Sequence, residues 1–290
     1  MSLGQFDYFT PRTIEEAIDL LKKHGAQARV LAGGTNLMVH IRHRAIQPKV
    51  LIGLKKVAEL DSIEFDPDRG LTIGAMALLA EVAAHPQIQT HYPAIAAAAV
   101  QTATVQIRNM GTVVGNICNA SPSADNVPTL LVMDATVAVA GPSGKRTIAL
   151  KDFFKGPGQT VLDRTEIVTA VTVPPPPSRT GVIYRSFSGR GTLDCSTVGI
   201  GVLITLDGEI CQNFRIAIGA CAPTPIRAYD AEQLLIGQRV DQKVIEAVSK
   251  QVSLATRPIS DLRADADYRL HLVKVLTSRV IEEAYQLARK

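Results

Sequence analysis

Two short stretches of this 290-residue sequence carry the small and polar residues that can surround a phosphate group. The first is AGGTN, residues 32–36, which lies between the apolar runs VL and LMV. Its glycines leave consecutive backbone N–H groups unblocked by a Cβ atom, and Thr35 and Asn36 add a hydroxyl and an amide. The stretch is neither G-x-G-x-x-G nor a P-loop, because no Gly-Lys-Ser/Thr follows it. Taken alone, this spacing favours a tight turn without a ligand.

The second stretch, RNMGTVVGNICNASPSADNVP at 108–128, shifts the balance toward ligand binding. GTVVGN at 111–116 again combines glycines with a hydroxyl and an amide, and Ser121, Ser123 and Asp125 follow. A dinucleotide needs N–H groups around its pyrophosphate and carboxylate or amide acceptors along its hydroxylated chains. Because the two stretches together offer both, they predict a dinucleotide site.

Several residues near these stretches have a second explanation. Asp125 suits a helix cap before NVPTLL as well as cofactor contact, which we favour. Arg108 either pairs with phosphate or braces the loop, and Cys118 either contacts a cofactor or fills apolar space. His40 and His43 are spaced as two metal ligands can be. No third ligand lies nearby, so we interpret them as part of a basic patch and predict no metal site.

The composition argues against several classes of protein. The net charge is only +4, from 31 basic and 27 acidic residues, and no block of five or more like charges occurs, which disfavours nucleic acid as the main partner. No apolar run is long enough to cross a bilayer, and the first residues do not resemble a signal peptide, so we expect a cytoplasmic protein. The four cysteines form no C-x-x-C pair, which argues against zinc ribbons and iron–sulfur clusters in this chain.

The first glycine stretch lies within a predicted small α/β unit. Thr13 with Glu16 starts a helix that Gly25 ends. Two β-like runs, ARVLA and KVLIGL, flank the stretch and a short helix over LMVHIRHR. A second unit begins at LTIGA, residues 71–75, and continues through alanine-rich helices to the second stretch. The later half of that stretch holds too many turn formers for a regular element, and β-like runs follow it.

The proline run VPPPPSR, residues 173–179, is the predicted domain boundary, because it suits neither a helix nor a central strand. Beyond it, GVIYRSF, STVGIGVLITL and CQNFRIAIGA predict an antiparallel sheet. Apolar residues at helical spacing predict helices over roughly 228–289. The sequence therefore predicts an α+β arrangement, with a sheet covered by helices, after the prolines.

Four landmarks of a known family occur in order along the chain. They are VLAGGTNLMV, QIRNMGTVVGNICNASPSADNVPTLLVMDA, SFSGRGTLDCSTVGIGVLI and IGACAPTPIRA. Over essentially its whole length the chain resembles the FAD-binding medium subunit of the molybdenum hydroxylases, which include carbon monoxide and xanthine dehydrogenases. The resemblance implies a vanillyl-alcohol-oxidase-like FAD-binding domain over 1–176, with α/β subdomains at about 1–56 and 57–176. A smaller C-terminal flavoprotein domain over 177–290, with an antiparallel sheet and helices, would follow.

The same resemblance implies that both glycine stretches hold FAD. The first would surround the pyrophosphate, the second would lie along the flavin and ribityl chain, and Asp125 would contact ribityl or ribose hydroxyls. Thr102 stands where xanthine dehydrogenases carry a phenylalanine, and Cys195 stands where an aromatic residue is frequent, so neither position shields the flavin ring. No catalytic side chain is implied. The implied cofactor-binding residues are Leu31, Ala32, Gly33, Gly34, Thr35, Asn36, Leu37, Thr102, Ala103, Ile107, Gly111, Thr112, Gly115, Asn116, Cys118, Asn119, Asp125 and Asp194.

The implied function is electron transfer within a larger oxidoreductase. A molybdenum-binding large subunit would oxidise substrate, [2Fe–2S] clusters on a small subunit would carry the electrons, and FAD in this chain would pass them to NAD, oxygen or a quinone. Two alternatives stay open. One is a non-catalytic scaffold subunit with a degenerate FAD site. The other is a self-sufficient FAD oxidase of the same superfold, although neither a substrate base nor a covalent flavin attachment is evident.

Overall fold

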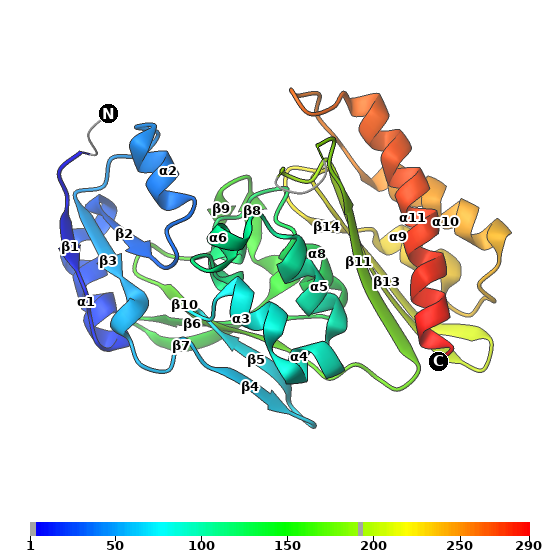
Figure 1. Cartoon of the computed structure of the whole chain (residues 1–290), viewed down its shortest axis with the longest axis horizontal. Coiled ribbons are helices and arrows are strands. Elements are labelled where there is room, and N and C mark those ends of the chain that lie inside the picture. The colour runs from blue at the N-terminus through cyan, green and yellow to red at the C-terminus, as the bar shows by residue number, and fades with distance from the viewer. Residues whose placement is uncertain (1–3, 191–193) are drawn as a thin grey trace.

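Three sheets with their helices follow one another along the long axis of the molecule (Figure 1). The structure is a computed structural model that describes residues 4–190 and 194–290. The described part of the chain begins beside the first sheet, and the C-terminus lies beside the third sheet at the opposite end of the molecule (Figure 1). This order in space repeats the order of the three units along the sequence.

The first unit is a small parallel sheet covered by one helix. Its strands pair in the order β1-β3-β2, with β1 at Asp7–Phe9, β2 at Ala28–Leu31 and β3 at Val50–Gly53. Helix α1 (Ile14–His24) begins where the Thr13 side chain accepts a hydrogen bond from the Glu16 amide, and it ends at Gly25. These bounds confirm the predicted helix. The short helix α2 (Leu37–Arg42) follows the first glycine stretch, as predicted.

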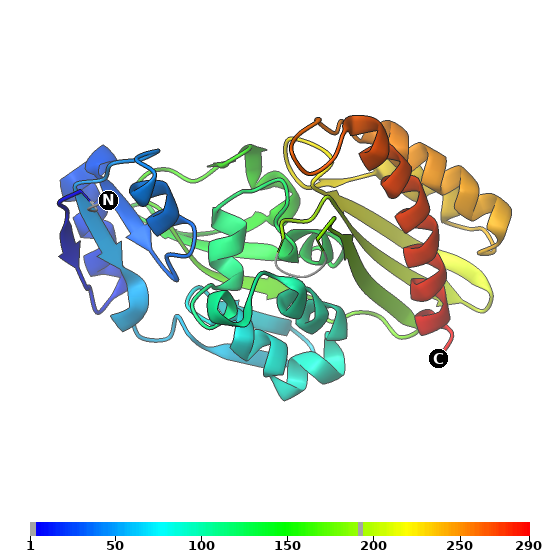
Figure 2. The same cartoon turned by 45° about the horizontal axis from the view of Figure 1, so that its top comes forward.

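The second unit is a five-stranded antiparallel sheet in the order β4-β5-β10-β6-β7. Of its helices, α5 and α8 contact the third sheet, which follows this sheet along the molecule in both views (Figures 1 and 2). A two-stranded hairpin, β8 and β9, joins β7 to β10. The elements are β4 (Ile63–Asp66), β5 (Gly70–Gly74), α3 (Leu79–Ala84), α4 (Pro86–His91), α5 (Pro93–Gln101), α6 (Val105–Arg108), α7 (Val113–Cys118), α8 (Asn126–Val132), β6 (Thr136–Gly141), β7 (Gly144–Ala149), β8 (Phe154–Gly156), β9 (Gln159–Thr160) and β10 (Ile167–Val173).

The third unit is an antiparallel sheet that is covered on both faces. Its strands pair in the order β11-β12-β13-β14. Helices α9, α10 and α11 form a layer on the outer side, while α5 and α8 of the second unit contact the same sheet from the inner side (Figure 1). Every residue of β12 except the last is therefore buried. The elements are β11 (Thr180–Phe187), β12 (Val198–Asp207), β13 (Ile210–Gly219), β14 (Ile226–Arg227), α9 (Tyr229–Leu235), α10 (Gln242–Ala255) and α11 (Ala266–Ala288).

The hydrophobic core divides near the proline run. The first cluster of buried side chains comes from residues up to Val173, with Leu203 and Ala217 added from the third unit. The second cluster comes from residues between Ile183 and Ala288. This division is compatible with the predicted boundary between 176 and 177, which stays a prediction. No helix among the described residues combines the length and the apolar character needed to cross a membrane.

A partly buried ion network ties the second unit to the third. The Arg227 guanidinium donates to both carboxylate oxygens of Glu232, at 2.9 and 2.7 Å, and its third nitrogen lies 2.9 Å from Asp134, directly after α8. Arg215 approaches the other oxygen of Asp134 at 2.6 Å. Glu232 is only 3% exposed, so Arg227 compensates a carboxylate that water does not reach.

Replacing Arg227 by methionine tests this network. The variant Arg227→Met leaves the Glu232 carboxylate buried without its cation. We expect the free energy of unfolding to fall by about 3 to 5 kcal/mol in a urea titration followed by circular dichroism. The matched control is Arg69→Met, which breaks an exposed ion pair with Asp66 and should change little. Equal small effects of both changes would contradict a stabilising role of the network.

Candidate functional site

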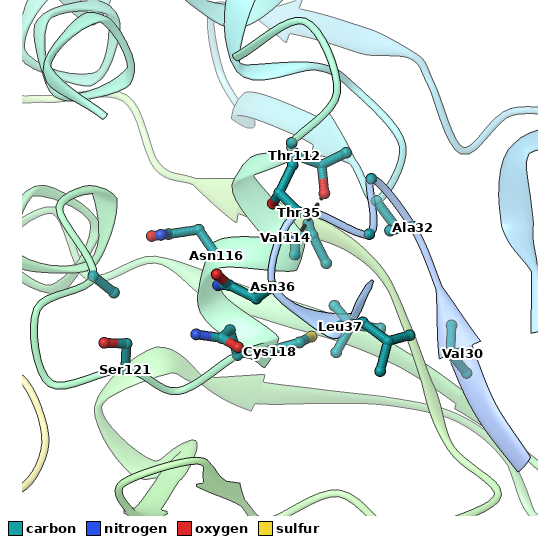
Figure 3. Close-up of a pocket in the computed structure, with 18 of the residues that line it drawn as sticks. Val30, Ala32, Thr35, Asn36, Leu37, Thr112, Val114, Asn116, Cys118 and Ser121 are labelled. Atoms are coloured by element: carbon teal, nitrogen blue, oxygen red, sulfur yellow. Dashed lines mark hydrogen bonds between the residues drawn. The ribbon is translucent and has the colours of Figure 1, made fainter. Parts of the chain in front are cut away.

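A cavity of about 690 Å³ lies where the first unit meets the second. Most of its wall comes from four parts of the chain, within residues 29–40, 102–125, 162–168 and 194–195, and Leu54, Ala75 and Leu79 complete it. In Figure 3 the first stretch, with Ala32, Thr35 and Asn36, lies beside the helix that carries Val114 and Cys118. The volume is within the range typical of ligand and cofactor sites.

The cavity brings together almost all of the residues that the sequence assigned to cofactor binding. Only Leu31 is absent from its wall. The Leu31 side chain packs against Gly34. A Cβ atom added to Gly34 would lie 2.9 Å from Leu31 Cδ1. The residues on the wall are Ala32, Gly33, Gly34, Thr35, Asn36, Leu37, Thr102, Ala103, Ile107, Gly111, Thr112, Gly115, Asn116, Cys118, Asn119, Asp125 and Asp194.

The first stretch presents unpaired backbone donors to the cavity. It connects the end of β2 at Leu31 to the start of α2 at Leu37, and Gly34 turns the chain with a φ of +72°. Among the described residues, no acceptor is hydrogen-bonded to the N–H groups of Gly33, Gly34, Thr35 or Asn36. Successive free N–H groups around a concave turn form a binding surface for an anion such as a phosphate oxygen.

The two glycine stretches touch through their backbones. A Cβ atom added to Gly33 would overlap the carbonyl oxygen of Met110 and lie 2.8 Å from the Cα atom of Gly111. Gly111 is itself held by its carbonyl oxygen, which accepts a hydrogen bond of 2.9 Å from the Leu79 amide. Only glycine at position 33 permits this approach, which closes one end of the cavity wall.

The hydroxyl of Thr102 is engaged within the protein. It donates to the Ala98 carbonyl oxygen at 2.9 Å and accepts from Asn126 Nδ2 at 3.1 Å. The same Nδ2 lies 3.3 Å from Asn116 Oδ1. Thr102 therefore contributes to the wall but joins α5 to α8, and the Asn116 amide nitrogen is the donor that remains for a ligand.

Arg108 braces the second stretch. One of its terminal nitrogens, Nη1, donates to the carbonyl oxygens of Thr102 at 3.1 Å and Ala103 at 2.7 Å. Ala103 has a φ of +49°, a conformation that costs energy in a non-glycine residue. Of the two explanations for Arg108, the structure shows bracing.

Cys118 provides no reactive thiol in the cavity, and the two histidines do not form a metal site there. Burial raises the pKa of the Cys118 thiol to about 12, so the thiol is protonated and acts as an apolar filler. His40 lies on the cavity wall, whereas His43 does not. Within the ranges that the structure describes, no three His, Cys, Asp or Glu side chains are placed to hold a metal ion.

Asp125 is bonded to the third unit and does not cap α8. Its side chain accepts no hydrogen bond from the α8 backbone, so the capping alternative is wrong. Its Oδ1 atom accepts from Tyr184 Oη at 2.8 Å and from Ser196 Oγ at 2.5 Å. Burial raises the pKa of Asp125, and the two hydroxyl hydrogen bonds oppose that effect. Asp125 is nevertheless one of the residues that line the cavity.

Asp194 contributes a charged group to the wall. Arg190 Nε donates to it at 2.9 Å, the Cys195 amide donates at 2.9 Å, and Arg263 lies 3.7 Å away. The hydrogen bond from Arg190 is the main reason that the pKa of Asp194 is lowered to about 2. Asp194 is therefore ionised throughout the neutral range.

The sequence analysis missed the part of the wall that comes from the start of β10. Leu162, Asp163, Glu166, Ile167 and Val168 line the cavity. The Glu166 carboxylate is held by Arg146 at 2.7 Å and lies at the side of the cavity as half of an ion pair. Ile167 and Val168 begin an ordinary β-like run, Leu162, Asp163 and Glu166 precede it, and nothing in these residue types indicates a binding site.

Two family models account for nearly all of the chain. The FAD binding domain in molybdopterin dehydrogenase matches residues 4–176. The CO dehydrogenase flavoprotein C-terminal domain matches residues 183–284. The first match alone spans more than half of the chain.

Proteins with similar sequences agree with these matches. A putative xanthine dehydrogenase FAD-binding subunit of Escherichia coli K12 is 35% identical over 282 residues, which cover 97% of this chain and 96% of the relative. The carbon monoxide dehydrogenase medium chain of Hydrogenophaga pseudoflava is 31% identical over 281 residues, which cover 97% of each chain.

Solved structures show the same fold. One is carbon monoxide dehydrogenase of Hydrogenophaga pseudoflava lacking the Mo-pyranopterin moiety of its molybdenum cofactor. A chain of it superposes with a TM-score of 0.96 at 31% identity and covers 99% of each chain. Quinoline 2-oxidoreductase of Pseudomonas putida 86 gives a TM-score of 0.94 at 28% identity and covers 100% of each chain.

Replacing Gly33 by alanine tests the contact between the two stretches. The added methyl group overlaps the Met110 carbonyl oxygen, so one backbone must move away. We expect Gly33→Ala to lower the free energy of unfolding by about 1 to 3 kcal/mol, measured in a denaturant titration. Gly4→Ala is the control, because no atom lies within 4 Å of its added Cβ. Unchanged stability of Gly33→Ala would show that the two stretches do not pack as described.

Proposed function

Because the chain belongs to the family of FAD-binding medium subunits of the molybdenum hydroxylases, we propose that it holds one FAD in the cavity and transfers electrons through it. The observation that carries this proposal is the row of unpaired N–H groups at Gly33–Asn36 on the wall of a cavity of cofactor size. In the proposed complex these donors surround the pyrophosphate, whose negative charge they complement.

The remaining wall residues fit the other parts of FAD. The Asn116 amide nitrogen and the Asp125 carboxylate offer a donor and an acceptor to hydroxyl groups, as a ribityl or ribose chain requires. Leu37, Ile107 and Val168 offer apolar surface to the planar rings. The proposed FAD-binding domain is 1–176, with subdomains at about 1–56 and 57–176, and 177–290 is the proposed C-terminal domain.

FAD supplies redox chemistry that no side chain provides, because it accepts a pair of electrons and releases them singly or together. The chain's own part is to bind and orient this group and to exclude water from it. The protonated thiol of Cys118 does not compete as a nucleophile, and the ionised Asp194 places a fixed negative charge at the wall. No side chain of the cavity is required as a general acid or base.

The proposed partners follow from the relatives. Several are named medium chains or subunits, which supports assembly with an iron–sulfur small subunit and a molybdenum-binding large subunit. In this proposal electrons enter from [2Fe–2S] clusters of the small subunit and leave to NAD, oxygen or a quinone. The molybdenum cofactor and the clusters belong to the partner subunits.

The variant Gly34→Asp tests the proposed role in the assembled enzyme. The Cβ atom of an aspartate at position 34 would lie 2.9 Å from Leu31 Cδ1, and the residue would keep a φ of +72° that side chains rarely adopt. The turn must therefore move, which displaces the N–H groups proposed to surround the pyrophosphate and adds a negative charge beside them. We expect the complex with Gly34→Asp to lack flavin. With the enzyme's substrate, its iron–sulfur clusters should still be reduced, while electron delivery to the external acceptor is lost.

The control is the same complex with Gly4→Asp, whose side chain extends into open space. Rapid-mixing absorption spectroscopy follows the clusters and the flavin separately. Delivery to the acceptor at the unaltered rate by a flavin-free Gly34→Asp complex would contradict the proposed function and support a scaffold role. Flavin retained by Gly34→Asp would contradict the proposed place of the pyrophosphate.

A further inference from the structure

The Asp125 carboxyl group is bonded to two residues that do not reach the cavity. Tyr184 lies on β11 and Ser196 lies two residues before β12, so both belong to the third unit. Tyr184 is 1% exposed and Ser196 is 6% exposed, and neither contributes to the cavity wall. Asp125, by contrast, lies on the wall. A carboxyl group of the second unit thus receives its protein hydrogen bonds from the third.

Both hydroxyls donate to the same oxygen. Tyr184 Oη and Ser196 Oγ approach Oδ1 of Asp125, at 2.8 and 2.5 Å. Two donors on one oxygen fix the rotation of the carboxyl group, and they leave Oδ2 as the oxygen available to a ligand. Burial and the adjacent carboxylate raise the pKa of the Tyr184 phenol well above its usual value, so it acts as a donor throughout the neutral range.

We propose that Tyr184 and Ser196 are positioning residues, which hold the Asp125 carboxylate so that its second oxygen accepts a hydrogen bond from a sugar-chain hydroxyl of the bound cofactor. This inference rests on the proposed function, because it assumes that FAD occupies the cavity. It adds that the third unit contributes to cofactor affinity through Asp125, without contact between Tyr184 or Ser196 and the cofactor.

The two hydroxyls also favour the ionised form of the Asp125 carboxyl group, which accepts hydrogen bonds. Burial raises the pKa of Asp125, and the hydrogen bonds from Ser196 and Tyr184 lower it. Tyr184 is the titratable group in direct contact, and no charged side chain adds to these effects. If FAD binds the ionised form, affinity falls as the pH falls through the pKa of Asp125. Loss of either hydroxyl raises that pKa, so the fall begins at a higher pH.

The test compares FAD affinity of the full-length chain with that of Tyr184→Phe, Ser196→Ala and the double variant. Each change removes one oxygen atom from a buried side chain. Quenching of flavin fluorescence gives the dissociation constant from about pH 5 to about pH 8. For the double variant we expect affinity about tenfold weaker at neutral pH, and a pH dependence displaced to higher pH. Asp125→Asn should abolish the pH dependence.

Matched controls remove hydroxyls elsewhere. Tyr92→Phe removes a buried phenol hydroxyl that donates to the Val173 carbonyl oxygen, and Ser249→Ala removes a buried hydroxyl of α10. Neither should alter FAD affinity or its pH profile.

A titration with FMN, which has the ribityl chain but no adenosine ribose, shows which cofactor hydroxyl Asp125 accepts from. If the variants also lose affinity for FMN, Asp125 accepts from a ribityl hydroxyl. If they lose affinity for FAD only, Asp125 accepts from a hydroxyl of the adenosine ribose.

Two outcomes would overturn the inference while the proposed function stands. In the first, the variants bind FAD like the unaltered chain at every pH. In the second, their affinity falls equally at every pH, as a purely structural defect would cause. Failure of the unaltered chain to bind FAD at any pH, both alone and with its partner subunits, would instead remove the proposed function, and the inference with it.

Discussion

The backbone contact between Gly33 and Met110 is the constraint on which the site depends. It joins a turn of the parallel unit to a loop of the antiparallel unit, and neither stretch alone encloses a cavity. A side chain at position 33 would separate the two stretches, and the row of free N–H groups would then face open solvent. The other wall features, including the engaged hydroxyl of Thr102 and the brace from Arg108, hold the second stretch where this contact requires it.

The third unit supports the site from behind. Its sheet is buried on both faces, because α8 lies against the side opposite to α11. Asp134 and Asp125, near the two ends of α8, are each bonded to side chains of the third unit. The C-terminal unit therefore fixes the position of α8, and with it the loop that carries Asp125. This arrangement links the cavity to a unit whose described residues contribute only Asp194 and Cys195 to the wall.

Local signals made much of this structure predictable from sequence. Thr13 and Gly25 set the ends of α1, and glycines with polar neighbours identified both stretches of the wall. Short elements were missed: β1 has three residues, and α6 and α7 have four and six, which is too few for a periodic pattern. The partners of Asp125 lie 59 and 71 residues away along the chain. Such pairings depend on tertiary packing, and no local pattern of residues encodes them.

The central claim is that this chain binds FAD in the cavity between its first two units. The most direct measurement is the visible absorption spectrum of the purified full-length chain after incubation with FAD and removal of the excess. Denaturation and mass spectrometry then identify and quantify what is released. The account predicts a flavin spectrum and one FAD per chain, retained also in the assembled complex. A chain that stays colourless, both alone and with its partner subunits, would contradict it.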